Sequence, residues 1–410
     1  MRVLPVLQQL VGTVARMTPQ LAFIAFLVAA MVFFGQRFGF FGNTIQLAPT
    51  SAANLVPGEG REVELFTLLP KDGIRSIDDP KFLAASEADW SLSTSVIGLQ
   101  INGDTRAYPL PVMAAHEIVN DLVGGQAVAV TYCPLCLTGI VFDRSIAGRV
   151  VEFGVSGKLL MNVLVMYDRE TDSLWSQILR EGITGPHKGE VLVVVDSLQT
   201  TWGTWRDLHP NSLILDADPR NDSYASYYRN GDAGVHGESL SDDRLPTKAV
   251  VVGLVVGRTA RAYPFAFAAQ AQVLNDVIEA IPVVAAFGTD GVTGVVYDRR
   301  LDDRELLFDA HSTDSLAMVD RETGSVWNRL SGEAVSGPLR GSVLRRMPAT
   351  NSFWFGWHDF YPQTTVYGID APGSQGLLDL GCANLARPCP ATAGSSVLAS
   401  EAARRHPLPA

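Results

Sequence analysis

The chain has 410 residues, of which 47% are hydrophobic and 18% are charged, so it is long and apolar enough for two or three domains. Its formal net charge of -11 gives no basic footprint for a polyanion. We therefore expect no nucleic acid among its partners.

An apolar segment near the N-terminus predicts a membrane anchor. Residues 21–35 are uncharged and almost wholly apolar, and the apolar run resumes as far as Gly42. About 20 such residues are needed to cross a bilayer, and the segment 21–42 just provides them. We therefore predict a transmembrane signal anchor over this segment.

The flanking charges predict which side of the membrane the chain faces. Arg2 and Arg16 precede the uncharged run 21–35 and only Arg37 follows that run closely, so residues 1–20 are expected in the cytoplasm. The bulk of this single-pass protein of the cell membrane would then be extracytoplasmic, on the periplasmic side. A cleaved signal peptide, cut within the small and polar residues 48–53, is the alternative. The globular part is expected outside the cytoplasm in either case, and that compartment permits disulfides, so none of the four cysteines can be assumed reduced.

The rest of the chain contains an internal duplication. Arg106-Ala-Tyr-Pro109 recurs as Arg261-Ala-Tyr-Pro264, and Asp168-Arg-Glu-Thr171 recurs as Asp320-Arg-Glu-Thr323. Such self-similarity predicts two homologous domains in tandem. The predicted parts are a spacer over 43–65, a first repeat over 66–216, a linker over 217–245, a second repeat over 246–369 and a disordered tail over 370–410 that holds Cys382 and Cys389.

Short alternating apolar segments separated by turn residues predict that strands dominate each repeat. Helices are predicted over 110–121 and 265–276. A shorter helix is predicted over 201–208, where Trp202 and Trp205 fall on one face. The fold class is therefore α+β, strand-dominated, with two homologous tandem domains after an N-terminal transmembrane helix.

The stretch 128–144 carries the most distinctive chemistry. It predicts a strand, a tight turn and a second strand, with Cys133 and Cys136 at the bend and Thr138-Gly139 as turn residues. In thioredoxin-like proteins a Cys-x-x-Cys opens a helix, whose N-terminus lowers the pKa of the first thiol. No helical pattern follows here. Two thiols on a hairpin bend resemble a metal knuckle more than a redox helix cap, although one pair supplies only two ligands.

The two repeats differ at the residues that could do chemistry. Cys133, Cys136, His116 and Glu117 are replaced in the second repeat by two glycines, an alanine and a glutamine. We therefore predict that the second repeat is a degenerate copy that supports or covers a site in the first. The two thiols and His116 are predicted to hold a transition metal, zinc or copper, because two sulfurs and one nitrogen suit such an ion. Glu117 is the candidate catalytic residue, as a fourth ligand, a support for a ligand or a general base for metal-bound water.

The same cysteines allow two other interpretations. They could act as an envelope thiol-disulfide oxidoreductase, or they could form a disulfide that only tightens the turn. In the second case the protein would be a non-catalytic binding module whose shared Trp and Tyr positions form a ligand groove. His116 could then be a helix residue that is hydrogen-bonded to a loop.

A set of motifs resembles a known family. The motifs are Arg106-Ala-Tyr-Pro109, His116-Glu-Ile-Val-Asn-Asp121, Thr131-Tyr-Cys-Pro-Leu-Cys136, Val155-Ser-Gly157, Met166-Tyr-Asp-Arg169 and Leu174-Trp-Ser-Gln177. Over roughly residues 77–368 the chain is similar to the bacterial and archaeal domain of unknown function 3179. The resemblance implies membership and, commonly, an exported or membrane-attached protein, but it supplies no activity. Leu137 departs from the family, whose members often carry glycine after the second cysteine, and Gly139 is expected to supply the turn instead.

Overall fold

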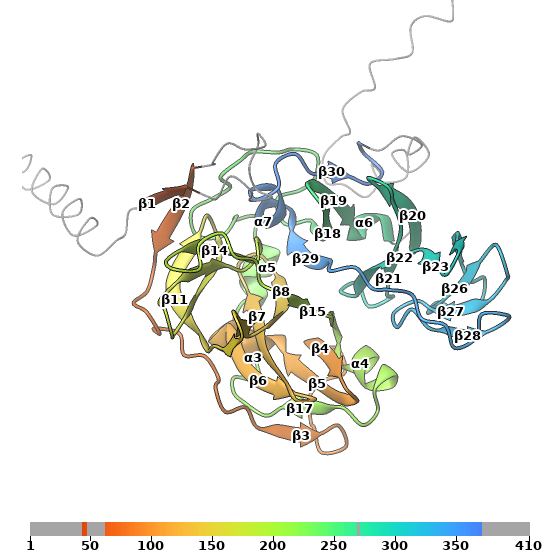
Figure 1. Ribbon diagram of the computed structural model, residues 1–410, viewed down its shortest axis with the longest axis horizontal. Coiled ribbons are helices and arrows are strands. Elements are labelled where there is room, and N and C mark those ends of the chain that lie inside the picture. Colours follow the sequence, from red (N-terminus) through yellow and green to blue (C-terminus); the bar gives the residue numbers. More distant parts are fainter. Residues whose placement is uncertain (1–42, 47–61, 269–270, 371–410) are drawn as a thin grey trace, which may run out of the picture.

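The computed structural model describes residues 43–46, 62–268 and 271–370 (Figure 1). The predicted cytoplasmic stretch, the anchor over 21–42, most of the spacer and nearly all of the tail, with Cys382 and Cys389, lie outside these residues. Within the described part of the chain, no helix is both long and apolar enough to span a bilayer.

Strands dominate the described residues, as the sequence predicts. In the first half, one sheet has the order β16 (Ser197–Thr201), β4 (Ser95–Ile101), β5 (Asp104–Pro109), β17 (Leu213–Leu215) and β3 (Phe82–Ala84). A second has the order β15 (Val194–Val195), β8 (Thr138–Asp143), β7 (Gln126–Cys133) and β6 (Ile118–Val123). A third has the order β1 (Asn43–Gln46), β2 (Glu62–Thr67), β11 (Phe153–Leu160), β12 (Val163–Asp168), β13 (Leu174–Ser176) and β14 (Glu181–Thr184). The remaining elements are the pair β9 (Ser145–Ile146) and β10 (Arg149–Val150) and the helices α3 (Leu110–His116), α4 (Trp202–Leu208) and α5 (Ala225–Arg229).

The second half repeats much of this order. Its first sheet runs β29 (Thr350–Phe353), β18 (Val250–Val256), β19 (Thr259–Pro264) and β30 (Thr365–Val366). Its second runs β20 (Val273–Ile278), β21 (Ile281–Phe287) and β22 (Gly294–Asp298), and its third runs β25 (Phe308–Ala310), β26 (Ala317–Asp320), β27 (Val326–Asn328) and β28 (Ala334–Ser336). The pair β23 (Arg300–Leu301) and β24 (Arg304–Glu305) and the helices α6 (Phe265–Ala268) and α7 (Trp354–His358) complete it.

Strand registers correspond between the halves at the duplicated residues. Val96 of β4 faces Pro109 of β5, and Val251 of β18 faces Pro264 of β19. The parallel pairing of β17 with β5 likewise has a counterpart in the parallel pairing of β30 with β19. The duplicated sequence thus forms corresponding strand pairs.

Two predicted helices are shorter than expected. The helix predicted over 110–121 ends at His116, because Glu117 has a positive φ of 59° and β6 begins at Ile118. The helix predicted over 265–276 is likewise α6 followed by β20. Apolar residues in a short strand can mimic a helical pattern, so the sequence did not separate the helix from the strand. The short helix over 201–208 is confirmed as α4, capped by the Thr201 side chain.

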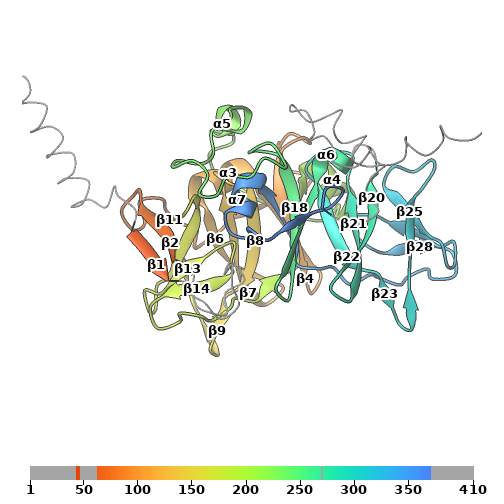
Figure 2. The ribbon, with the colours of Figure 1, turned by 90° about the horizontal axis from the view of Figure 1, so that it is seen from above.

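The hydrophobic core is continuous across the predicted linker. One cluster of buried residues contains both Cys136 and Trp354, and a second contains both Tyr108 and Tyr297. Figure 2 shows α3, α5 and α7 on the same side of the molecule. The Cys-x-x-Cys hairpin therefore lies where elements from both halves meet.

Candidate functional site

The two cysteines lie on a hairpin formed by β7 and β8. Almost every residue of β7 is buried, as expected for a strand covered on both faces, and Cys133 ends it. Cys133 faces Thr138 across the turn, which confirms the predicted strand, turn and strand. The left-handed residue of the turn is Leu137, with φ 61°, and Gly139 already belongs to β8. The expectation that Gly139 supplies the turn is therefore wrong.

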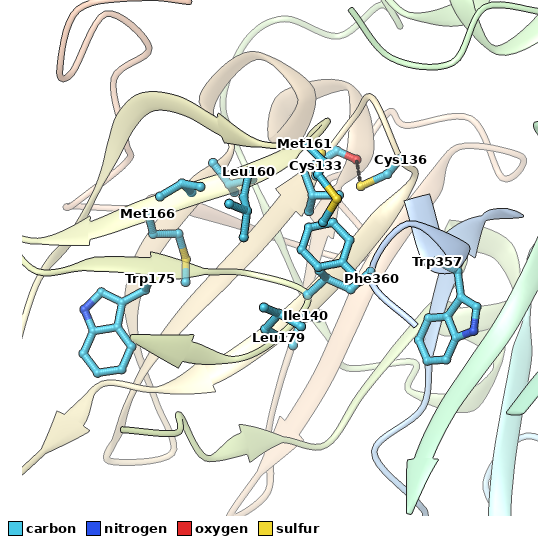
Figure 3. Close-up of a cluster of buried hydrophobic side chains, with 14 of the residues drawn as sticks. Cys133, Cys136, Ile140, Leu160, Met161, Met166, Trp175, Leu179, Trp357 and Phe360 are labelled. Atoms are coloured by element: carbon cyan, nitrogen blue, oxygen red, sulfur yellow. Dashed lines mark hydrogen bonds between the residues drawn. The ribbon is translucent and has the colours of Figure 1, made fainter. Parts of the chain in front are cut away.

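Both cysteines are free thiols and are buried, with 1% of Cys133 and none of Cys136 exposed. The Cys133 sulfur lies 3.8 Å from the carbonyl oxygen of Asn162, and the Cys136 sulfur lies 3.8 Å from the carbonyl oxygen of Cys133. Figure 3 shows both sulfurs at the edge of the first hydrophobic cluster, close to Met161. The pair thus lies in a dry environment that resists charge.

The two thiols have opposite acidities. Burial raises the pKa of Cys133, but hydrogen bonds from the Cys136 side chain and from the backbone of Leu164, Cys136 and Leu135 outweigh burial and leave that pKa lowered. Burial raises the pKa of Cys136 well above its ordinary range, and its hydrogen bond to Cys133 raises it further. If one proton leaves the pair, the negative charge therefore settles on Cys133.

Glu117 is a second unusual acid in the same place. Glu117 is only 9% exposed. It is the first residue after α3, and its positive φ ends this helix. Burial, followed by charge repulsion from Cys133, raises the pKa of Glu117 to about 8. A carboxyl group with this pKa can hold or release a proton near neutral pH.

Helix α5, in the segment predicted as a linker, covers the hairpin. The Tyr227 hydroxyl donates to the carbonyl oxygen of Leu135 at 2.7 Å, and the Tyr228 hydroxyl lies 3.0 Å from that of Tyr132. Burial, followed by the charges of Glu117 and Cys133, raises the pKa of the third tyrosine, Tyr224, to about 12. These phenols therefore border the thiols and the carboxyl.

The second half covers the other side of the turn. The Phe353 amide donates to the Cys136 carbonyl oxygen at 2.8 Å, and Ser352 Oγ lies 3.4 Å from the same oxygen. A Cβ added at Gly356 of α7 would lie 2.7 Å from the Cys136 Cβ, so this approach requires glycine. These contacts support the prediction that the second copy covers the first.

His116 is engaged away from the sulfurs. Its Nδ1 lies 2.8 Å from the Arg75 carbonyl oxygen and its Nε2 lies 3.2 Å from that of Asp218. Both ring nitrogens therefore face backbone oxygens. Among the described residues, no three or more His, Cys, Asp and Glu side chains are grouped so as to hold a metal ion. The structure thus places Cys133 and Cys136 on one turn, with Glu117 near enough to Cys133 for their charges to interact, and places His116 in another contact.

Sequence reasoning missed two contributors to the site. One is the row Tyr224, Tyr227 and Tyr228, whose clustering in a polar linker was the available signal. The other is Asn162, which is buried and whose Oδ1 accepts the amides of Val235 and His236 at 2.9 and 3.1 Å. Asn162 therefore fixes the segment after α5 beside Cys133.

The predicted Trp-lined ligand groove is not found at the shared tryptophans. Their side chains are all buried in the core, each with 3% exposure or less: Trp175, Trp202, Trp205, Trp327, Trp354 and Trp357. Their conservation between the repeats therefore reflects packing.

Fold and site together define a strand-rich protein with a buried Cys-x-x-Cys hairpin. Residues 71–364 match the family described as "Protein of unknown function (DUF3179)". This match covers well over half of the chain, so the chain belongs to that family, as the motifs indicated. No curated protein and no solved structure matches the chain.

Proposed function

We propose that the chain carries out thiol-disulfide exchange through Cys133 and Cys136. The observation that carries this proposal is a pair of free, buried thiols on one hairpin turn, in which a hydrogen bond from Cys136 lowers the pKa of Cys133. A nucleophilic thiol needs thiolate character, and a resolving thiol must stay protonated until the mixed disulfide has formed. The adjacent Glu117 carboxyl, with a pKa of about 8, adds a group that can move that proton.

The exchange balances with these three groups. The Cys133 thiolate attacks one sulfur of a substrate disulfide and forms a mixed disulfide with it. The other substrate sulfur leaves and takes a proton from the Glu117 carboxyl group. The Cys136 thiol then gives its proton to the Glu117 carboxylate and attacks the Cys133 sulfur, and the second substrate sulfur leaves as thiolate. The pair is oxidised to a disulfide while the substrate disulfide is reduced to a thiol and a thiolate.

Access to the pair would come from the side of α5. This helix has only five residues, none of which is fully buried. Short segments with few buried contacts open at low free-energy cost. The α7 side is closed by the Gly356 backbone. We therefore expect a substrate to displace α5 before it reaches Cys133.

A second candidate is binding of a transition metal by the two sulfurs. It is favoured by the backbone hydrogen bonds from Leu135 and Cys136, two and three residues after Cys133, which stabilise a thiolate at the start of a knuckle-like turn. Two thiolates suit monovalent copper, whereas zinc needs further ligands. In the described part of the chain neither Glu117 nor His116 is grouped with the two sulfurs as a metal ligand, so either side chain would have to move to bind the ion, and His116 would also have to leave its two carbonyl contacts.

One experiment separates the two candidates. The full chain is purified with Cys382→Ser and Cys389→Ser, so that only the hairpin thiols remain, and is compared with versions that also carry Cys133→Ser or Cys136→Ser. Metal content and thiol number are measured after equilibration in a series of dithiol redox buffers.

Thiol exchange predicts that both thiols are lost together as a two-electron couple. It also predicts that Cys136→Ser accumulates a mixed disulfide on Cys133, whereas Cys133→Ser does not react. Stoichiometric copper or zinc that disappears in both single variants would replace exchange by metal binding. A disulfide that forms but cannot be reduced by any of the buffers would instead indicate the structural staple of a binding module.

The cellular context of this proposal rests on the sequence. We infer that residues 21–42 anchor a protein of two tandem repeats in the cell membrane, with the thiol site outside the cytoplasm, where disulfide substrates occur. Carbonate extraction of membranes and protease digestion of spheroplasts that express the full chain test this topology. A protein released by carbonate, or digested only after the spheroplasts are lysed, would contradict it.

A further inference from the structure

A groove runs along the outer edge of β20 in the second half. Its cavity has a volume of about 590 Å³ and is lined by residues that include Asn275, Phe308, Asp309, Arg321 and Tyr367. In the described part of the chain, β20 is the edge strand of its sheet, with β21 as its only partner. An exposed strand edge is a template for another extended segment.

The corresponding edge in the first half is occupied. There, Ile77 forms a parallel bridge with Val119 of β6. The Ile77 amide donates to the Ile118 carbonyl oxygen at 2.9 Å, and the Asn120 amide donates to the Ile77 carbonyl oxygen at 2.8 Å. The segment 75–78 thus lies along the outer edge of β6 and pairs with it through one isolated parallel bridge, as an added strand of a single paired residue.

Side chains fix the sequence of this added strand. Asn120 Nδ2 donates to Asp78 at 2.7 Å, and Arg169 donates to Asp78 and to Ser76, both at 2.9 Å. His116 faces the Arg75 carbonyl oxygen in the same strand. The edge therefore selects an apolar residue followed by an aspartate, Ile77-Asp78.

The second half keeps the groups that receive such a strand. Asn275 exchanges two hydrogen bonds with Phe308, as Asn120 does with Phe153, and so holds the same orientation. Arg321 corresponds to Arg169 and pairs with Asp309 at 2.7 Å. Since Arg169 donates to two carboxylates at once, the pair with Asp309 does not prevent Arg321 from donating to a second carboxylate.

We infer that this groove binds residues 377–380 of the chain's own C-terminal part, Leu-Leu-Asp-Leu, as an added strand. Leu378-Asp379 repeats the order of Ile77-Asp78. The described chain ends three residues beyond Tyr367, which lines the groove. The eight residues from there to Leu378 can span up to about 26–29 Å, which gives the segment ample reach.

In this arrangement Asp379 meets Arg321, and the Asn275 amide donates to the carbonyl oxygen of Leu378. The short strand lies within the tail that the sequence alone predicts to be disordered. Because it is tethered close to its groove, even a weak strand addition is populated through a high effective concentration.

Hydrogen exchange of the full chain tests this inference. The wild type is compared with Leu378→Gly/Asp379→Asn and with a matched control, Leu398→Gly/Glu401→Gln, which makes the same kinds of change further along the tail. Exchange is read by mass spectrometry over the β20 amides, with those of β6 as an internal reference.

We expect the β20 edge amides to exchange roughly tenfold or more faster in the Leu378/Asp379 variant, while the control variant and β6 remain at wild-type rates. Adding a synthetic peptide of residues 374–382 to the variant should restore protection, and Arg321→Gln should weaken that restoration. Equal β20 exchange in all chains would overturn the inference. Restoration by the peptide without any difference between wild type and variant would show a peptide groove that serves a partner rather than the tail, and would overturn it as well.

Discussion

The turn that carries the thiols and its counterpart in the second half, residues 288–293, share a design but differ in chemistry. Each joins two antiparallel strands, and each is covered by the element before a Trp-bearing helix of the other half. Ser352 and Phe353 contact Cys136, whereas Thr200 Oγ1 lies 2.6 Å from Thr293 Oγ1. The two halves thus cover each other's turns, and burial alone does not distinguish the thiol site.

The difference lies in what satisfies the turn amides. In the first turn the backbone of Leu135 and Cys136 donates to the Cys133 sulfur. In the second turn the Asp290 carboxylate accepts the amides of Val292 and Thr293 at 3.1 and 2.9 Å. A permanent carboxylate makes a fixed turn, whereas a sulfur that gains and loses charge makes one whose stability depends on its chemistry.

The buried groups behind the two turns differ in the same sense. Arg329 Nη1 donates to Gln272 Oε1 at 2.7 Å in the second half. The corresponding residues in the first half are Gln177, whose Nε2 donates to Thr131 Oγ1 at 2.9 Å, and Glu117. At these two corresponding positions the second half therefore has a buried cation and no acid, and the first half has a buried acid and no cation. This contrast teaches that Glu117, as much as the cysteines, sets the first site apart.

The largest expected effect follows from Glu117→Gln, which makes this position resemble Gln272. Because the folded pKa of Glu117 is raised to about 8 from 4.5, its contribution to stability is fully present below pH 4.5 and is lost as the pH rises through 8. Glutamine does not ionise, so the free energy of unfolding of the variant should rise relative to that of wild type as pH rises. We expect a difference on the order of 3–5 kcal/mol at pH 9. Urea titrations between pH 5 and 9 measure this difference.

Glu87→Gln, at an exposed carboxylate, is the matched control. In this variant the free energy of unfolding should depend on pH as it does in wild type. If Glu117→Gln followed the same profile, the carboxyl would be ionised at little cost, and its part in the proposed proton transfer would be lost.

The next largest effect is expected for Asp290→Ala in the second turn. The carboxylate accepts two amides and also the Thr204 hydroxyl at 3.1 Å, so its loss should lower the free energy of unfolding by about 2–3 kcal/mol. The pKa of Asp290 is lowered because these hydrogen bonds outweigh its burial. Its contribution is therefore present above pH 3.8 and fades as pH falls, so wild type and variant should converge in acid.

Urea titrations at pH 7 and pH 3 check this prediction. Asp290→Asn, which keeps one acceptor oxygen, should lose less than the alanine variant at pH 7. An alanine variant as stable as wild type at pH 7 would mean that the turn amides find other partners.

Gly356→Ala tests the contact between α7 and the thiol turn. The added Cβ would lie 2.7 Å from the Cys136 Cβ, and such overpacking costs about 1–3 kcal/mol. Cys136→Gly removes the opposing Cβ and gives the first turn the glycine that the second has at Gly291. The double variant should therefore recover stability relative to Gly356→Ala in urea titrations. Equal losses in the single and double variants would place the strain elsewhere in α7.

Much of this architecture could be predicted from the sequence. The duplication, the strand-turn-strand hairpin and α4 follow from spacing and periodicity, which depend on local chemistry. The end of α3 at His116 could not, because Ile118 to Val123 continue an apolar pattern that fits either a helix or a strand. The positive φ of Glu117 that separates the two has no signature in a glutamate.

The site was predicted in part, for a related reason. The joint loss of four chemical residues from the second repeat drew attention to the two thiols and to Glu117, whose acidity is linked to Cys133 by charge. It also included His116, whose partner Arg75 belongs to the strand added on β6. The second half has alanine in place of this histidine, and among the described residues no strand lies at its matching edge. Two separate losses thus looked like one, and only the spatial arrangement separates them.

The smallest effect concerns backbone conformation alone. Leu137 has φ 61° in the first turn, and Gly291 has φ 75° in the second. A Cβ added at Gly291 meets no atom within 4 Å, so Gly291→Ala removes and creates no contact. It should still lower the free energy of unfolding by about 1–2 kcal/mol, because left-handed conformations disfavour a side chain. Gly231→Ala, which also meets nothing but lies outside the left-handed region, should change urea stability by less than about 0.5 kcal/mol. If both variants matched wild type, the second turn would relax freely and its left-handed position would not require glycine.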